Sequence, residues 1–339
     1  MKKAVSRTLH VVISAIIIVG LVLFARTVNW HDTWQRILST DLEVLLFAVI
    51  VNLASLVLKG VRWWVFLRSI GVRSIWLALR ATFAGAGLNN ILVANGGEAA
   101  SVVFVARASH TPSAKVLATL ALERMFEVIG YVVLLVLAVS FLELPPSLAR
   151  TRPVAWIALA ILVIFGIYLI RRPESAETLV AVTPEGWRAR FGAYMKHFAN
   201  TVGGISTGPR FAIALVLSVA IWALQLWTYA LTARAAHFNL PLVGTIAALL
   251  AVNIGFVVRA TPGNVGLFQA MYALTAVGFG MDRDQAIAVA LLIQTQQILP
   301  VTLIGVGLAP EFIFKRKQTV RKRDEGLQLR SRSEEAASL

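Results

Sequence analysis

The sequence predicts an all-α polytopic membrane protein, arranged as an inverted repeat with about six full spans and two re-entrant broken helix hairpins. Apolar residues make up 58% of the 339 residues, charged residues make up only 14%, and the mean hydropathy is +0.75. A soluble domain cannot bury that much apolar surface, so the chain is predicted to lie in a membrane. The second observation is a pair of polar interruptions, at residues 89–98 and 259–269, within otherwise apolar stretches. Such paired breaks in the two halves of a chain indicate the binding site of a transporter.

Six apolar stretches are long enough to be full spans, and two shorter pairs flank the interruptions. The expected spans are residues 9–25, 42–58, 116–142, 154–170, 211–233 and 286–308. The expected hairpins pair residues 75–93 with 99–106, and 242–258 with 265–279. Residues 1–311 are therefore predicted to form a single transmembrane domain, with repeat halves at about 9–142 and 154–308 and a polar interfacial loop at 171–210. The basic segment 312–339 is predicted to be a disordered cytoplasmic tail.

The positions of the basic residues orient the chain. With both termini on the cytoplasmic side, 23 of the 32 Lys and Arg residues fall in inner segments and 5 fall in outer segments. The positive-inside rule predicts such an excess. Together with attraction to anionic lipids, it explains the net charge of +15 without a nucleic-acid partner. In this assignment residues 59–74 form a cytoplasmic loop after the second span, and the protein resides in the inner (cytoplasmic) membrane.

The same count relates the two halves of the chain. Both flanks of the first break fall inside and both flanks of the second fall outside, so a two-fold axis in the membrane plane would relate the halves. Two full crossings in place of each hairpin would satisfy the count equally well. Both arrangements therefore stay open.

Three charged residues lie inside the apolar stretch 116–142. Glu123 and Glu127 are four residues apart and share one helix face, and Arg124 is adjacent to the first of them. A charge at the bilayer centre costs about 2.5–3.5 kcal/mol on insertion scales, so these side chains must face protein or a water-filled cavity. The group could bind a lipid phosphate through Arg124 and a proton through a carboxylate, or it could be a buried ion pair that joins two helices.

Polar residues near the breaks are further candidates. Glu98 follows two glycines at an expected helix start, where its carboxylate would bind a ligand or only stabilise the helix end. Arg259 could share an anionic group with the helix that begins after Pro262 and Gly263, or it could extend to the membrane interface. Side-chain amides could bind a headgroup, satisfy backbone groups freed by the breaks, or bond between helices. The amide residues are Asn89, Asn90, Asn253, Asn264, Gln294, Gln296 and Gln297.

Four stretches together resemble the lysylphosphatidylglycerol synthase transmembrane family, a flippase-like family of integral membrane proteins. They are Arg62-Trp-Trp, Asn89-Asn90 with Asn95-Gly-Gly-Glu98, Glu123-Arg-Met-Phe-Glu127 and Pro262-Gly-Asn-Val-Gly266. The likeness covers about residues 10–310 and implies lipid translocation or lipid-carrier export by a protein with two re-entrant helix pairs.

The chain differs from the family pattern at two places. It has Ala99-Ala-Ser-Val102 where the family usually places an Arg, and Gln269 where the family often has Glu. These differences leave the lipid headgroup unassigned. The soluble aminoacyl-transferring domain of some relatives is not expected in these 339 residues.

These observations predict a lipid flippase. Its central polar cavity would receive a phosphate-bearing headgroup, of a phospholipid or a polyprenyl-linked lipid, while the acyl or prenyl tails stay in the bilayer. The expected substrate-binding residues are Arg62, Asn90, Glu98, Glu123, Arg124, Glu127, Arg259, Asn264, Gln269 and Gln297. The expected structural breaks are Gly96, Gly97, Pro262, Gly263 and Gly266. Arg62, Trp63 and Trp64 are also interpreted as an interfacial anchor, ahead of any contact with a headgroup.

No catalytic residue, cofactor or metal site is expected. The sequence has no cysteine, no phosphate-binding loop before a strand, no Ser/His/Asp arrangement, and five scattered histidines without ligand spacing. Two other functional classes stay open. One is a non-transporting accessory subunit of a lipid or cell-envelope synthesis complex, and the other is an intramembrane lipid transferase with Glu98 or Glu123 as base. The expected partners are anionic membrane lipids, with a second copy of the chain or an envelope-synthesis protein as further candidates.

Overall fold

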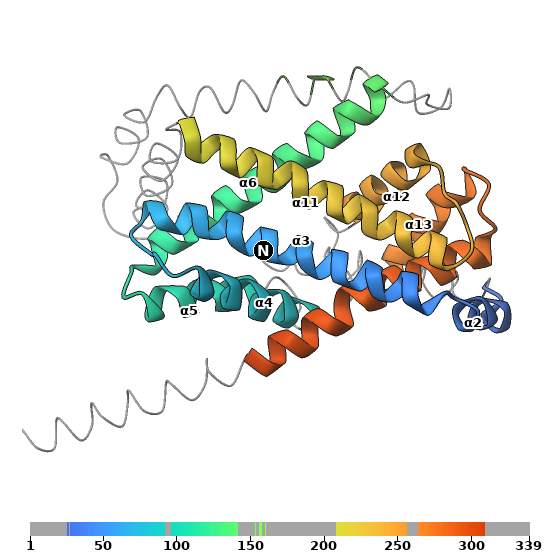
Figure 1. Ribbon diagram of the computed structural model, residues 1–339, viewed down its shortest axis with the longest axis horizontal. Helices are drawn as coiled ribbons and strands as arrows, with labels where there is room; N and C mark the ends of the chain where they lie inside the picture. Colours follow the sequence, from blue (N-terminus) through green and yellow to red (C-terminus); the bar gives the residue numbers. More distant parts are fainter. Residues whose placement is uncertain are drawn as a thin grey trace, which may run out of the picture.

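The described part of the chain is built from helices. The computed structural model describes residues 28–91, 96–141, 208–255 and 264–308, with isolated positions at 26, 153, 156, 157 and 160. All regular secondary structure within those residues is helical (Figure 1). The expected span 9–25, the expected tail 312–339, and most of the expected span 154–170 and the expected loop 171–210 lie outside the described residues.

Two long helices cross the centre of the molecule side by side. They are α3 (Leu42–Ser69) and α11 (Gly208–Ala235), and they run antiparallel (Figure 1). The backbone N–H of Asp41, just before α3, donates to the carbonyl of Ala235 at the end of α11 at 2.9 Å. With 28 residues at about 1.5 Å each, α3 is about 42 Å long.

The expected end of the second span at residue 58 is wrong, because α3 continues to Ser69. Lys59 and Arg62 therefore lie within the helix and not in a loop. Carboxylates on α6 face both side chains and compensate their charge, as the site geometry below shows. A single-span hydropathy argument cannot include such a partner, since the partner lies about 60 residues further along the chain.

The first interruption lies in an antiparallel helix hairpin. Its arms are α4 (Ile75–Ile91) and α5 (Gly96–Ala108). The hydroxyl of Ser101 donates to the carbonyl of Ala81 at 2.7 Å, and a Cβ on Gly97 would lie only 2.0 Å from the carbonyl oxygen of Gly85. The two arms thus touch backbone to backbone near their tip, which only glycine permits at Gly97.

The second interruption has the same design. Its arms are α12 (Leu242–Gly255) and α13 (Leu267–Val277). The amide of Asn264 donates to the carbonyl of Gly255 at 3.2 Å, and Asn264 and Gly266 have positive φ angles of 58° and 89°. Gly266 thus has a left-handed backbone directly before α13, whereas Pro262 and Gly263 lie outside the described residues.

The hairpin bases lie at opposite ends of α3. α4 begins six residues after α3 ends, whereas α12 begins shortly after the end of α11, beside the start of α3. Each hairpin is followed by another long helix. This is α6 (Ser113–Phe141) after the first hairpin and the helix Arg283–Leu308 after the second. The order of long helix, hairpin and long helix therefore occurs twice.

Exposed apolar side chains cover the outer faces of the helices. Among the described residues, three helices are long and apolar enough to cross a membrane: Leu42–Ser69, Pro209–Ala235 and Arg283–Leu308. Large side chains such as Ile50, Val216, Leu274 and Leu303 are more than 60% exposed, as lipid-facing positions are. The short helix α2 (Trp30–Leu38) adds two exposed tryptophans. The described part of the chain is thus all-helical, and its long apolar helices indicate a membrane-embedded protein.

Candidate functional site

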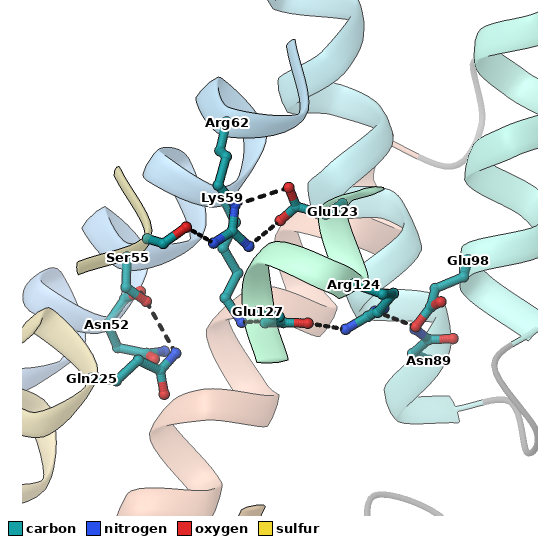
Figure 2. A network of polar contacts seen from close by, with 11 residues as sticks. Asn52, Ser55, Lys59, Arg62, Asn89, Glu98, Glu123, Arg124, Glu127 and Gln225 are labelled. Carbon is teal, nitrogen blue, oxygen red and sulfur yellow. Dashed lines mark hydrogen bonds and ion pairs between the residues drawn. The ribbon is translucent and has the colours of Figure 1, made fainter. Parts of the chain in front are cut away.

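The candidate site begins with basic residues on α3 that face acidic residues on α6. Lys59 and Arg62 are three residues apart, and Glu123 and Glu127 are four apart, so each pair lies on one helix face. The two faces meet, and two ion pairs join them, Arg62 with Glu123 and Lys59 with Glu127 (Figure 2).

Arg62 forms the buried end of this set. Its side chain is 0% exposed, and its Nε and Nη2 donate to the two carboxylate oxygens of Glu123 at 2.9 and 2.5 Å. Its Nη1 donates to the hydroxyl of Ser218 on α11 at 2.7 Å. The guanidinium is thus bound on both sides and joins α3, α6 and α11. Since the pair is enclosed and bidentate, it has the geometry in which a buried ion pair is stable.

The remaining charges form an alternating chain that leads to the first hairpin (Figure 2). Lys59 Nζ donates to Glu127 Oε1 at 2.7 Å. The other oxygen of Glu127 accepts from Arg124, whose second amino group donates to Glu98 in the first turn of α5. Positive and negative groups therefore alternate from α3 through α6 to α5.

Asn89 links the tip of the first hairpin to Glu98, the last residue of this series of ion pairs. Its side-chain oxygen accepts from the backbone N–H of Gly97 at 2.9 Å, and its amide donates to Glu98 at 3.5 Å. The predicted role of Asn89 in satisfying backbone freed by the break is confirmed. Glu98 accordingly points away from the helix axis toward Arg124 on α6.

A cavity of about 140 Å³ lies among α3, α4, α5 and α6. Arg124 is half exposed, at 48% of its side chain, although it is held by two carboxylates. The hydroxyl of Thr82 is buried and has no hydrogen-bond partner among the described residues. The cavity is lined by Leu56, Lys59, Trp63, Thr82, Gly85, Ala86, Asn89, Glu98, Ser101, Leu120, Glu123, Arg124 and Glu127.

The predicted site residues separate into two groups. Glu98, Glu123, Arg124 and Glu127 all line the cavity, and Arg62 lies directly behind it. Asn90 instead donates to the hydroxyl of Thr302 at 3.0 Å. Arg259 lies outside the described residues. The other three predicted residues, at the second hairpin and the last helix, are Asn264, Gln269 and Gln297.

At the second hairpin, uncharged side chains form the hydrogen bonds that link the hairpin to neighbouring helices. Gln269 in the first turn of α13 accepts from the N–H of Gly266 at 2.6 Å and donates to Gln294 at 2.5 Å. Gln297 bonds to the hydroxyl of Tyr229. The bond from Gln269 to Gln294 takes the place that the Glu98 to Arg124 ion pair has in the first half. In both halves, the first turn of the second arm is bound to the following long helix.

Sequence reasoning missed Lys59 and misassigned its neighbours. Arg62 is 0% exposed and Trp63 is 3% exposed, so the interpretation of these two as an interfacial anchor is wrong. Trp63 donates from its indole to Thr119 at 3.1 Å inside the protein. The spacing of Lys59 and Arg62, matched to that of Glu123 and Glu127, is the signal that could have paired the two helices. Ser218 carried no signal, because its role depends on the packing of α11.

The described residues contain no group of three or more His, Cys, Asp or Glu side chains that could hold a metal ion. The candidate site is instead a cluster of ion pairs beside a small polar cavity in an apolar helical protein.

Comparison with known proteins identifies the family of the chain. The sequence profile of the lysylphosphatidylglycerol synthase TM region matches residues 11–305. The chain belongs to this family. It is also 23% identical over 322 residues to the UPF0104 membrane protein PH1989 of Pyrococcus horikoshii, an alignment that covers 86% of this chain and 94% of that protein. No solved structure matches the chain.

Three of the four stretches on which the resemblance to this family is based lie at or beside the cavity, and the fourth, at residues 262–266, belongs to the second hairpin. These three stretches contribute Arg62 on α3, Asn89 and Glu98 of the first hairpin, and Glu123, Arg124 and Glu127 on α6. Apart from Lys59 and Ser218, they supply all the residues of the polar network described above. Residues that are far apart in the sequence therefore form one site.

Proposed function

We propose that this protein is a lipid flippase that moves a phosphate-bearing headgroup, of a phospholipid or a polyprenyl-linked lipid, across the cytoplasmic membrane. The observation that carries the proposal is the polar cavity beside the hairpin tip, with the half-exposed guanidinium of Arg124 in its wall. Arginine binds phosphate through two parallel N–H donors, and in lipid such a group is retained only inside protein or water.

Re-entrant hairpins would bring this cavity to membrane depth. At about 1.5 Å per residue, the arms α4 and α5 are about 26 and 20 Å long, and α12 and α13 are about 21 and 17 Å long. A hydrocarbon core is about 30 Å thick, so each arm is too short to cross it without an interfacial extension or local thinning of the bilayer. Short antiparallel arms with both ends at one base favour hairpins that enter and leave on the same side.

An inverted repeat follows from the same argument. The hairpin bases lie at the two ends of α3, which is long enough to cross the membrane. The hairpins would therefore enter from opposite faces, and six full spans would complete the fold with both termini cytoplasmic. Such half-membrane helices create the polar chamber that transport of a charged headgroup requires.

Transport without covalent chemistry is the proposal for this site. Each of the three carboxylates in the cavity wall accepts from a cation, which is the arrangement expected of ion pairs that exchange with a charged headgroup. Anionic lipids are the proposed partners, since Arg124 would exchange a carboxylate for a phosphate.

Reconstitution of the purified full chain tests the proposal. In phosphatidylcholine vesicles with a trace of acyl-labelled fluorescent phosphatidylglycerol, dithionite quenches only the outer leaflet, so flipping exposes additional label. A hydrogen bond to a charged group contributes about 1.5–3 kcal/mol, so Arg124→Ala should reduce the flipping rate roughly ten- to hundredfold. Arg36→Ala is the matched control, because Arg36 also forms an ion pair, with Asp282, but far from the cavity.

Three results would count against the flippase. Equal rates for wild type and Arg124→Ala would remove Arg124 from the mechanism. A covalently modified lipid, detected by mass spectrometry, would favour the transferase. A chain that is inert alone but co-purifies with one envelope protein would favour the accessory subunit.

A further inference from the structure

The charges around the cavity balance. Lys59, Arg62 and Arg124 carry positive charges, and Glu98, Glu123 and Glu127 carry the same number of negative charges. Any anion that enters this neutral cluster brings one uncompensated negative charge beside carboxylates that are themselves largely buried. Poorly solvated charges are costly unless they are paired, so uptake of a positive charge together with the anion would be favoured.

The pairing identifies which carboxylate would lose its partner. Glu123 is held by Arg62, which is fully buried and does not line the cavity. Glu127 is held by Lys59 as well as by Arg124. Glu98 has Arg124 as its one cationic partner among the described residues, with the neutral amide of Asn89 beside it at 3.5 Å. A phosphate that takes the donors of Arg124 therefore leaves Glu98 without a cation.

We propose that Glu98 binds a proton when a phosphate headgroup takes Arg124, so that the site accepts a phosphate monoanion and a proton together. The inference rests on the proposed function, and it identifies a proton as the ion that is taken up together with the lipid. The proton comes from water in the cavity and binds a carboxylate oxygen of Glu98. The protonated carboxyl then needs no cation, and the cluster stays neutral.

The surroundings of Glu98 agree with this role. Its side chain is 18% exposed, so water reaches it but solvates it poorly. The adjacent α4 offers Asn89, α6 offers Glu123, Arg124 and Glu127, and α3 offers Lys59. Glu98 lies in the first turn of α5, whose dipole supplies only about half an elementary charge in place of the full charge of Arg124. The dipole alone therefore does not replace the lost cation.

The second hairpin supplies a comparison within the same chain. The equivalent contact there joins the amides of Gln269 and Gln294, neither of which titrates. From Gln285 to Leu308 the last helix has no titratable side chain. Proton binding is therefore assigned to the first hairpin, and the second hairpin holds its contact whatever the pH.

Calorimetry on the full chain in detergent tests the proposal. Binding of dihexanoyl phosphatidylglycerol is measured at pH 7 in two buffers of different ionisation enthalpy, and the difference in heat gives the protons taken up. Wild type should take up about one proton per lipid, and its affinity should fall about tenfold per pH unit above neutrality. Glu98→Gln, which is neutral at every pH, should bind the lipid without proton uptake. Asp282→Asn removes a distant ion pair and should behave as wild type.

The outcomes separate proton uptake from transport. Lipid binding by wild type without proton uptake or pH dependence overturns the coupling and leaves the flippase intact. Unchanged uptake in Glu98→Gln overturns the assignment to Glu98. Absence of lipid binding, together with absence of flipping, overturns both proposals. The soluble phosphodiester glycerophosphoglycerol is the second arm: binding as tight as that of the lipid would make a free phosphodiester the ligand and overturn the lipid assignment.

Discussion

Removal of the charge on Glu123 should destabilise the protein more than any other single polar substitution in the described helices. Glu123→Gln keeps the size of the side chain and leaves the guanidinium of Arg62 without its carboxylate. Arg62 is 0% exposed, and its other partner is the hydroxyl of Ser218, which carries no charge. Breaking a buried pair on one side costs about 3–5 kcal/mol.

This cost sets the expected thermal shift. For a large domain, about 1 kcal/mol corresponds to about 2–4 °C in Tm, so Glu123→Gln should lower Tm by roughly 6–20 °C. The assay is loss of the monodisperse peak in fluorescence-detected size-exclusion chromatography after heating in detergent. The surface pair of Arg36 and Asp282 is the control, because an exposed pair contributes about 0–1 kcal/mol.

A double substitution separates charge from packing. Arg62→Met with Glu123→Leu removes both charges and keeps apolar volume, so it should recover most of the stability that Glu123→Gln loses. The reasoning would be refuted if Glu123→Gln shifted Tm no more than Asp282→Asn does. It would also fail if the double variant were as unstable as the single one.

Two further predictions address the hairpins. Gly97→Ala should destabilise the protein by about 1–3 kcal/mol, because the new Cβ would lie 2.0 Å from the carbonyl oxygen of Gly85. Gly307 has open space around it, so Gly307→Ala should be neutral or slightly stabilising in the same melting assay. Ser74 directly precedes α4, and the carbonyl of Ser39 lies 2.9 Å from the ring of His237, shortly before α12. Because the chain has no cysteine, Ser74→Cys and Ser39→Cys report on the two hairpin bases alone, and a membrane-impermeant maleimide should label them from opposite sides of the membrane. Labelling of both from one side would disprove the inverted arrangement.

The local pattern of apolar and polar residues along the sequence was sufficient to predict much of the fold. Hydropathy predicted the long helices at 42–58, 116–142, 211–233 and 286–308, and each overlaps a helix of the structure. The positive φ of Gly266 is a local property that its residue type favours, whereas Gly97 is helical and is required by its close contact with Gly85. The error at the end of α3 has the opposite cause. Lys59 and Arg62 look like loop residues when only their neighbours in the sequence are considered.

The candidate site was predicted in part for the same reason. Glu123, Arg124 and Glu127 were identifiable, since charges within an apolar stretch must have partners. Their partners were not identifiable, because Lys59 on α3 and Glu98 on α5 are joined to α6 only by packing.

By itself, the sequence of this member of the lysylphosphatidylglycerol synthase TM region family determined that the chain is helical, lies in a membrane and is interrupted twice. Composition and glycine placement decide these properties, since each depends on residues that are close together in the chain. Only the tertiary structure decided that Arg62 is a buried structural residue, that Arg124 lies half open beside a cavity, and that Glu98 depends on it. Those properties depend on contacts between separate helices, and the energy of an ion pair depends on the distance and burial that packing establishes.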